Sequence, residues 1–218
     1  PGSPNADAIR ELYVIVMIFG LIIFIGVEIF LIRALIKYRA SKGAVAEGPA
    51  MNNKLELGWT LGAAGLVLLL AVVTFVKLPE VTTPPNGEPV AEFAKSSRMA
   101  SLVPVPAPPN GKKMTITVTG RQYIWRYTYG SQLNSPFAYT EMVAPSDTVV
   151  VLKIQASDVI HSWWIPALGG KFDAVPGSTN YTWFKAPTPK NPEGDVYKGQ
   201  CAELCGSQHA NMIASVRV

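Results

Sequence analysis

The sequence predicts an α+β membrane protein in which a two-helix transmembrane hairpin precedes an all-β sandwich domain. Two long runs near the start of the chain are almost free of charge, and a Pro-rich stretch follows them. The rest alternates between apolar and polar residues with the period of a β-strand. Only 16% of the 218 residues are charged, against about 25% in an average soluble domain. This shortage of charge indicates that part of the chain lies in lipid.

Each apolar run is long enough for one membrane-spanning helix. Residues 12–32 contain a single charged side chain, Glu28, and residues 58–76 contain none. A bilayer core of about 30 Å needs roughly 20 helical residues, so we predict spans at about 12–36 and 55–78. Two buried core helices are the alternative, but core helices rarely run this far without a charge. Glu28 either faces a partner helix or takes part in proton or subunit contacts.

The loop between the two runs sets the expected orientation. It carries four basic residues, Lys37, Arg39, Lys42 and Lys54, and a single acidic one, Glu47. The positive-inside rule therefore predicts that this loop faces the cytoplasm. Both termini and the whole second part of the chain then lie on the outer side of the membrane.

The chain accordingly divides into a hairpin (1–78), an extended connector (79–110) and an outer domain (111–218). The connector holds 8 of the 18 prolines, which neither continue a helix nor fit a central strand. Short strands punctuated by Gly and Pro favour a sandwich or barrel for the outer domain. We expect them near 115–119, 123–129, 149–155, 181–184, 196–198 and 213–218.

The residues best suited to chemistry gather near the C-terminus. Cys201, Cys205, His209 and Met212 lie within 12 residues, and the only other histidine is His161, in an upstream segment that we predict to be a loop. These two segments therefore hold every thiol and imidazole of the chain. Thiolates, imidazoles and a thioether form a soft ligand set that suits copper. Calcium and magnesium are excluded from this cluster because they require oxygen ligands.

The residues alone leave several arrangements open. Cys205, His209, Met212 and His161 satisfy a single-copper site, with Cys201 as a spectator. The two thiolates can instead bridge two copper ions, each of which also takes one imidazole. A disulfide between the cysteines and a zinc site of two Cys and two His are further alternatives. Neither of these last two explains the methionine.

At these residues the chain resembles subunit II of the haem–copper cytochrome c oxidases. The family's complete copper-ligand motif is matched by Cys201-x-Glu203-x-Cys205-x3-His209-x2-Met212. The segments 158–163 and 170–177 are also similar to family segments, the first of them to its first-histidine loop. The resemblance implies a cupredoxin-like Greek-key sandwich that carries a binuclear copper centre, called Cu-A.

The resemblance implies a role for each ligand. The two Cys sulfurs would bridge both coppers, and His161 and His209 would each bind one. Met212 would be the weak ligand of one copper, and the backbone carbonyl of Glu203 that of the other. The Glu203 side chain would help to hold a magnesium or manganese ion at the interface with subunit I, as suits a hard cation.

The resemblance also implies a function and partners. The chain would accept electrons from a cytochrome c, free or tethered, and pass them to haem in subunit I. Dioxygen is reduced to water there, with proton pumping, and subunit III is a further expected partner. We expect the bacterial inner membrane rather than the mitochondrial one. Tyr123 stands where the family usually has the Trp that receives the electron, and Trp125 is the next aromatic on that face; both are candidates for this role. Asp158 is a candidate docking contact for the donor.

Composition and motifs weigh against other classes of protein. The basic residues are scattered, so nucleic-acid binding is not expected, and no Cys-x-x-Cys-His motif for a c-type haem occurs. A quinol oxidase subunit lacks the copper ligands, and nitrous oxide reductase is soluble and His-rich. A copper carrier would need an exposed, exchangeable site. The outer domain has 10 basic and 7 acidic residues, so an acidic or tethered donor fits better than strong steering of a basic one.

Overall fold

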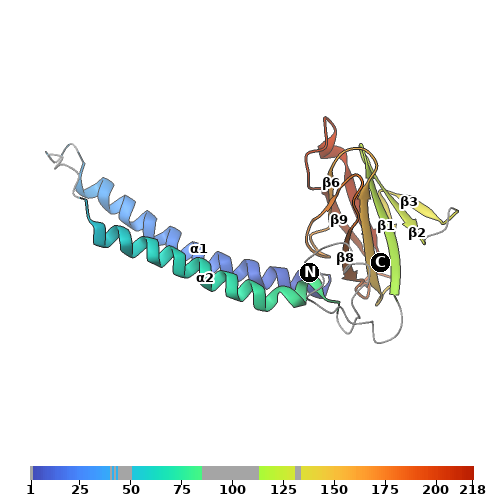
Figure 1. The fold of residues 1–218 in the computed structure, drawn as a ribbon, viewed down its shortest axis with the longest axis horizontal. Helices are drawn as coiled ribbons and strands as arrows, with labels where there is room; N and C mark the ends of the chain where they lie inside the picture. The colour runs from blue at the N-terminus through green and yellow to red at the C-terminus, as the bar shows by residue number, and fades with distance from the viewer. Residues whose placement is uncertain (1, 40, 42, 44–50, 85–112, 131–133) are drawn as a thin grey trace. The chain divides into compact units, whose positions relative to one another are not determined.

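The computed structural model describes residues 2–39, 41, 43, 51–84, 113–130 and 134–218. The chain forms two compact units. One unit comprises Arg10–Val76, and the other combines Pro1–Ile9 with Lys77–Val218. The first unit contains most of two long helices, and the second contains all the strands of the described residues (Figure 1).

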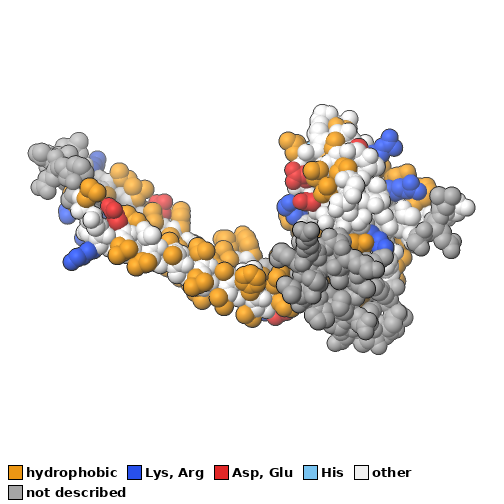
Figure 2. Space-filling view, in the orientation of Figure 1, with side chains coloured by type: hydrophobic (Ala, Val, Ile, Leu, Met, Phe, Trp, Pro, Cys, Tyr) orange, Lys and Arg blue, Asp and Glu red, His pale blue; other side chains and the backbone are white. Residues whose placement is uncertain are grey.

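The two helices are α1 (Pro4–Lys37) and α2 (Asn53–Thr82). Their most apolar stretches have mean hydropathies of 3.0 and 2.4, and nothing within the described structure buries them. Hydrophobic side chains cover the helices along their length (Figure 2). A helix with apolar residues on all sides is stable only when lipid or protein surrounds it. The predicted pair of long apolar helices is therefore confirmed.

Helix α2 runs further than the sequence predicts. It passes Pro79 and ends at Thr82, after which the Thr83 N–H donates to the Pro79 carbonyl over 2.8 Å. Proline removes one backbone donor and its ring crowds the carbonyl four residues earlier, and the helix ends three residues after it. The rest of the predicted connector, residues 85–110, lies outside the described residues.

The β domain consists of two five-stranded sheets (Figure 1). The first sheet has the order β3-β2-β1-β5-β8. Its strands are β1 (Lys113–Arg121), β2 (Ile124–Tyr129), β3 (Phe137–Tyr139), β5 (Val149–Ala156) and β8 (Asn180–Lys185). The second sheet has the order β4-β10-β9-β6-β7. Its strands are β4 (Glu141–Val143), β6 (His161–Trp164), β7 (Phe172–Ala174), β9 (Val196–Cys201) and β10 (Ile213–Arg217).

The domain core consists of residues from both sheets. On β2 the side chains alternate, so that Trp125 and Tyr127 are fully buried while Arg126 between them is exposed. Each such buried side chain contributes about 1.5–3 kcal/mol of hydrophobic stabilisation. On strand β5, Val149–Leu152 and Ile154 are buried, so both faces of the strand are covered over its first half. A second small cluster on the first sheet comprises Val149, Val151 and Trp183.

Each of the six segments expected to form strands does so, but four other strands were missed. β3, β4 and β7 have three residues each, and β6 has four. Such short segments are too brief to show a period of two. The prediction that His161 lies in a loop is wrong, since this histidine is the first residue of β6 and pairs with Ala174 of β7.

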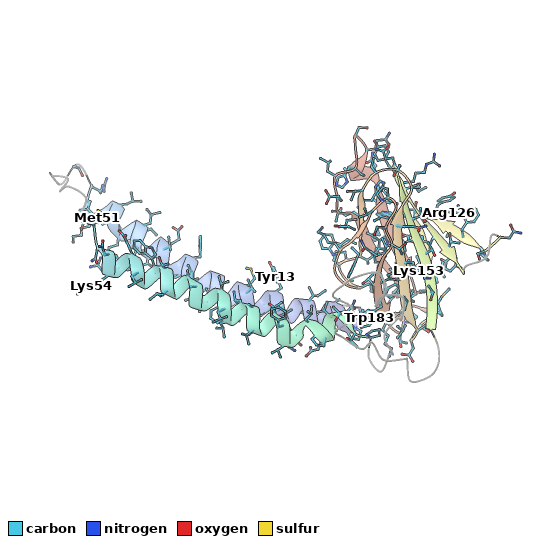
Figure 3. All side chains as sticks on the ribbon, viewed as in Figure 1. Tyr13, Met51, Lys54, Arg126, Lys153 and Trp183 are labelled. Atoms are coloured by element: carbon cyan, nitrogen blue, oxygen red, sulfur yellow. The ribbon has the colours of Figure 1, made fainter. Side chains whose placement is uncertain are left out.

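The N-terminal residues are hydrogen-bonded to the free edge of the first sheet. Ser3 and Asn5 are both buried, and the Ser3 hydroxyl donates to the Asn5 side-chain carbonyl over 2.5 Å. The Asn5 amide donates to the Trp183 carbonyl over 2.9 Å, and the Lys185 N–H donates to the Ser3 hydroxyl over 3.1 Å. Trp183 is labelled on β8 in Figure 3. Unpaired backbone groups on an edge strand invite association, so these side chains protect the edge of β8.

Replacing Asn5 by Ala is expected to destabilise the β domain. The change leaves a buried carbonyl of β8 without its donor, a loss of about 1–3 kcal/mol. Thermal unfolding of the full chain in detergent, with hydrogen exchange at the Lys185 amide, measures the effect. Asn191→Ala is the matched control, because the Asn191 amide bonds to Asp195 within an exposed loop. Equal effects of the two substitutions would contradict the edge contact.

Candidate metal centre

Two neighbouring strands of the second sheet position the candidate ligands. His161 begins β6, Cys201 ends β9, and the two strands pair antiparallel. The chain then loops from Cys201 through the 3-10 helix η3 (His209–Asn211) to Met212, directly before β10. The Cys201 N–H donates to the Met212 carbonyl over 2.9 Å, which closes the base of this loop. Residues about 40 positions apart in sequence are thus neighbours.

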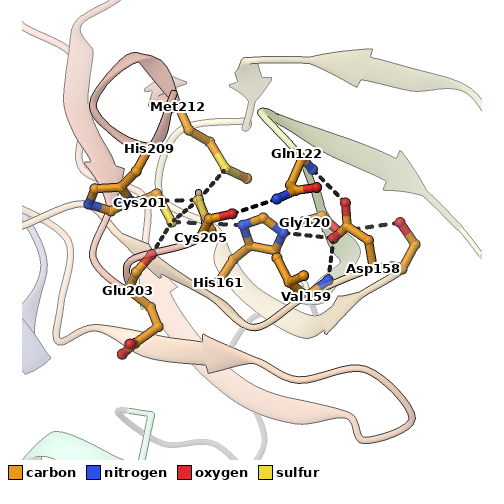
Figure 4. A network of polar contacts seen from close by, with 11 residues as sticks. Gly120, Gln122, Asp158, Val159, His161, Cys201, Glu203, Cys205, His209 and Met212 are labelled. Atoms are coloured by element: carbon orange, nitrogen blue, oxygen red, sulfur yellow. Dashed lines mark hydrogen bonds and ion pairs between the residues drawn. The ribbon is translucent and has the colours of Figure 1, made fainter. Parts of the chain in front are cut away.

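The two cysteine sulfurs lie at the centre of the cluster (Figure 4). They are 3.9 Å apart, well beyond a disulfide bond of about 2.05 Å. The Cys201 Sγ lies 4.0 Å from Nδ1 of His161. The Cys205 Sγ lies 3.6 Å from Nδ1 of His209 and 3.9 Å from Sδ of Met212. Each sulfur therefore faces the other sulfur and one imidazole, so the donor set could hold a soft metal ion.

Glu203 presents its two oxygen groups in different directions. Its backbone carbonyl oxygen lies 3.3 Å from the Cys201 sulfur, whereas the carboxylate points away from the cluster and is exposed (Figure 4). The carbonyl oxygen thus lies beside the sulfur and nitrogen donors, and its role as a metal ligand stays a prediction. The carboxylate is free to meet a hard cation or a partner surface.

The cluster is part of the hydrophobic core. His161 and Met212 are fully buried, and both thiols belong to the main core cluster between the sheets. Burial, together with the charge of the neighbouring Cys201, raises the pKa of the Cys205 thiol to about 11. The metal-free site therefore holds the Cys205 thiol protonated at neutral pH, and a bound metal must displace its proton.

Copper uptake by the metal-free chain is expected to strengthen as pH rises. The Cys205 thiol must lose its proton to bind copper, so the apparent affinity should rise between about pH 7 and 9, by about tenfold per pH unit for each proton released. Competition with a copper(I) chelator across this range measures the slope, since copper(I) does not oxidise thiols. A pH-independent affinity would show that the thiols are not ligands.

Asp158 contacts His161 on the side away from the sulfurs. The Asp158 Oδ1 lies 2.8 Å from Nε2 of His161, and the carboxylate also accepts the N–H groups of Gln122 and Val159 over 2.7 Å each. Partial burial alone would raise the pKa of Asp158, but these hydrogen bonds outweigh it and hold the pKa below the ordinary 3.8. The ionised carboxylate favours a proton on Nε2 and so leaves Nδ1, which faces Cys201, unprotonated.

The two aromatic candidates occupy different positions. Trp125 is fully buried, and its ring meets that of His161 edge-on, with centroids 5.9 Å apart. Tyr123 is half-buried in the turn between β1 and β2. Its hydroxyl lies 3.4 Å from that of Ser207, in the loop from Cys201 to Met212, which we call the ligand loop. Of the two, only Tyr123 reaches both the solvent and the ligand loop.

Sequence reasoning missed the role of Gln122. Its side-chain amide donates to the Cys205 carbonyl over 2.6 Å, although the two residues are 83 positions apart. The one available signal was a long polar side chain in a hairpin turn where Gly or Asn is usual. Glu28, by contrast, is half-buried on α1, and its role stays a prediction.

The fold and the donor set together define a membrane-anchored protein whose cupredoxin-like β-sandwich holds a cluster of sulfur and nitrogen ligands. The family model for the transmembrane domain of cytochrome c oxidase subunit II matches residues 1–76, and the model for its periplasmic domain matches residues 132–218. Cytochrome c oxidase subunit 2 of Candida albicans is 30% identical, over 96% of this chain and 78% of its own length. The chain belongs to the cytochrome c oxidase subunit II family.

Other proteins are similar to this chain as well. Cytochrome c oxidase subunit 2 of Alkalihalophilus pseudofirmus is 33% identical over 97% of this chain. The chain spans 55% of that relative's length. Among solved structures, the periplasmic domain of subunit II of cytochrome oxidase of Bradyrhizobium japonicum is 35% identical, over 48% of this chain and 82% of its own, with a TM-score of 0.43.

Proposed function

We propose that this chain is the electron-accepting subunit of a cytochrome c oxidase. It receives electrons from a cytochrome c and passes them to haem in subunit I, where dioxygen is reduced to water with proton pumping. The observation that carries the proposal is the convergence of every thiol and imidazole of the chain, with one thioether and one backbone carbonyl, on a single buried cluster. Membership of the subunit II family supports the same function.

We assign the cluster to two copper ions. The sulfurs of Cys201 and Cys205 would hold both ions, and His161 and His209 would each supply one imidazole. Met212 and the Glu203 carbonyl would be the weaker donors. The pairing of one sulfur with one imidazole, twice over, supports two ions rather than one. Bound copper would supply a one-electron redox centre in this position.

The chain's own residues make the cluster suitable for fast electron exchange. Core packing excludes water from His161 and from both thiols. The Asp158 carboxylate fixes the ring of His161, and the edge of Trp125 packs against the same ring. Ligands held this firmly move little when the charge at their centre changes. Little reorganisation means a low barrier to transfer.

Tyr123 is the better candidate for the aromatic that receives the electron. It is partly exposed and contacts the ligand loop through Ser207. Trp125, by contrast, is fully buried in the core. We propose that Trp125 instead packs the ring of His161 in place. The outer face of the first sheet carries Arg126 and Lys153, each stacked over an aromatic ring (Figure 3). These cations support a donor that is acidic or tethered rather than basic.

The proposed orientation places the β domain on the outer side of a bacterial inner membrane. The cations Lys37 and Lys54 lie beside the loop that joins the two helices, and this placement favours a cytoplasmic loop. Residues 2–8 pack on the β domain, so both ends of the described chain belong on one side. Subunit I would meet this unit through the exposed Glu203 carboxylate, with a magnesium or manganese ion between them, and subunit III is a further expected partner.

One experiment tests the assignment. The full chain is purified in detergent and loaded with copper, and its copper content and paramagnetic resonance spectrum are recorded. Two coppers per chain that share one unpaired electron are expected. One copper with a localised electron, or one zinc in place of copper, would overturn the two-copper proposal. The full chain is required because residues 2–8 are part of the β domain.

A further inference from the structure

The two ligand segments are both held by a residue that is not itself a ligand. Gln122 belongs to the turn between β1 and β2, in the first sheet. His161 and the loop from Cys201 to Met212 belong to the second sheet. Any contact from this turn to both segments therefore joins the two sheets across the ligand cluster.

Gln122 makes two such contacts, one from its backbone and one from its side chain (Figure 4). Its backbone N–H donates to Oδ2 of Asp158 over 2.7 Å, and Oδ1 of the same carboxylate faces Nε2 of His161. Its side-chain amide donates to the carbonyl of Cys205 over 2.6 Å. The backbone hydrogen bond thus fixes the histidine side of the cluster, since it is charge-assisted. The side-chain hydrogen bond fixes the cysteine side.

The ligand loop is shaped to receive this turn. Gly206 follows Cys205 with a φ of +133°, a conformation that side chains disfavour. A Cβ on Gly206 would lie 2.5 Å from the hydroxyl of Tyr123 and 2.9 Å from Nε2 of Gln122. Glycine at this position therefore serves close approach as well as backbone conformation. Without it, the amide of Gln122 would be pushed off the Cys205 carbonyl.

The two ends of the loop are held differently. At its base, the Ala202 N–H donates to the Ser162 carbonyl on β6 over 2.8 Å, and Cys201 bonds to Met212. At its tip, the contact with the first sheet is made by Gln122 on Cys205 and by Tyr123 beside Ser207. The tip carries the second sulfur, so the separation of the two sulfurs depends on this contact.

We propose that Gln122 is a positioning residue that fixes the relative positions of the ligand side chains before a metal binds. It does so by joining the Asp158–His161 pair to the Cys205 end of the ligand loop. The inference deepens the proposed function, since it concerns the same cluster. The geometry it explains is nevertheless that of the metal-free chain. Its test can therefore fail or succeed independently of copper and of electron transfer.

Gln122→Met tests the side-chain hydrogen bond alone, because it keeps the length of the side chain and the backbone N–H but removes the donor. Three amides report on the loop, since those of His209, Asn211 and Met212 donate to carbonyls inside it. In the metal-free full chain, hydrogen exchange at these amides is expected to rise about five- to tenfold, the effect of one lost hydrogen bond. Amides of β1 and β5 should keep their protection, whereas a merely stabilising residue would change exchange throughout the domain.

Two further variants make the result decisive. Gln155→Met is the matched control, because Gln155 lies on the same sheet and its amide bonds to the Thr119 hydroxyl rather than to the ligand loop; exchange in the loop should not change. Gln122→Asn keeps the amide but shortens the reach by one methylene, and it is expected to raise loop exchange as the Met variant does. Unchanged loop exchange in both Gln122 variants would overturn the proposal.

A spectroscopic measurement on the loaded protein separates positioning from stability. All proposed ligands remain in Gln122→Met, so its copper content should equal that of the unmodified chain. Its paramagnetic resonance and visible spectra are expected to broaden, because the ligands then admit more than one arrangement. Its loss of copper to a chelator should accelerate about five- to tenfold. Spectra and loss rate identical to those of Gln155→Met would contradict a positioning role.

Discussion

Replacing Cys201 by Ser is expected to halve the copper content of the chain and to localise the unpaired electron on the remaining ion. The Cys201 sulfur faces the Cys205 sulfur, the imidazole of His161 and the carbonyl of Glu203. A serine hydroxyl in this position is a hard and poorly ionised donor, which does not bridge copper ions. Cys205, His209, Met212 and His161 would remain, and this set suffices for a single copper ion.

The effect is measured on the copper-loaded full chain by metal analysis and by paramagnetic resonance. The hyperfine pattern should change from that of one electron shared between two copper nuclei to that of one nucleus. Gln208→Ala is the control, because the exposed side chain of Gln208 lies in the same loop, makes no capping hydrogen bond and is not a proposed ligand; its spectrum should match that of the unmodified chain. If Cys201→Ser keeps the shared-electron pattern, Cys201 does not bridge.

The second large effect is expected from Asp158→Asn, which should weaken copper retention by about 10–100-fold, the usual cost of losing a partner that orients a metal-bound histidine. The variant removes the negative charge that holds the Nε2 proton of His161. An amide in its place can present either its oxygen or its nitrogen to the ring, so the orientation of Nδ1 toward Cys201 is no longer enforced. Competition against a chelator in the full chain measures the loss.

Asp173→Asn is the matched control for this change. Asp173 lies on β7, in the sheet that contains His161. Its exposed carboxylate pairs with Lys171 at 3.6 Å. Its neutralisation should leave copper retention unchanged. Asp158 was predicted from the sequence as a docking contact for the donor, which stays a prediction. If Asp158→Asn changes only the salt dependence of reduction by cytochrome c, docking rather than ligand orientation is its role.

The contact between Asp158 and His161 should also persist into acidic solution. Because the pKa of Asp158 in the folded chain is below the ordinary 3.8, its contribution to stability is fully present above that value. The contribution is lost only as the pH falls through the lower, folded value. A loss of structure at the histidine near neutral pH would therefore need another cause.

Much of this molecule was accessible from the pattern of its residues. The absence of charge over residues 58–76 favours a helix in lipid, because a helix satisfies its own backbone hydrogen bonds there. Alternation along β2 indicates that Trp125 and Tyr127 share one face of the strand, and both side chains are indeed buried. The confinement of every thiol and imidazole to two short segments predicted a soft metal site, because no other thiols or imidazoles exist in the chain.

The elements that escaped sequence reasoning share a cause. Strands such as β6 and β7 are stabilised by their partners rather than by a pattern of their own, so periodicity cannot reveal them. His161 is therefore in a strand, where a loop was expected. The contacts of Ser3 and Asn5 with β8 join positions about 180 residues apart. No local signal marks such a pairing.

The sequence by itself determined the kind of protein, a membrane hairpin with a β domain, and the atoms available to a metal. Both follow from composition and local periodicity, which act over a few residues. Only the tertiary structure decided that Gln122 joins the two ligand segments, that Asp158 faces His161, and that Tyr123 rather than Trp125 reaches the surface. These depend on how two sheets pack across a core, and that geometry is fixed by contacts between residues far apart in the chain.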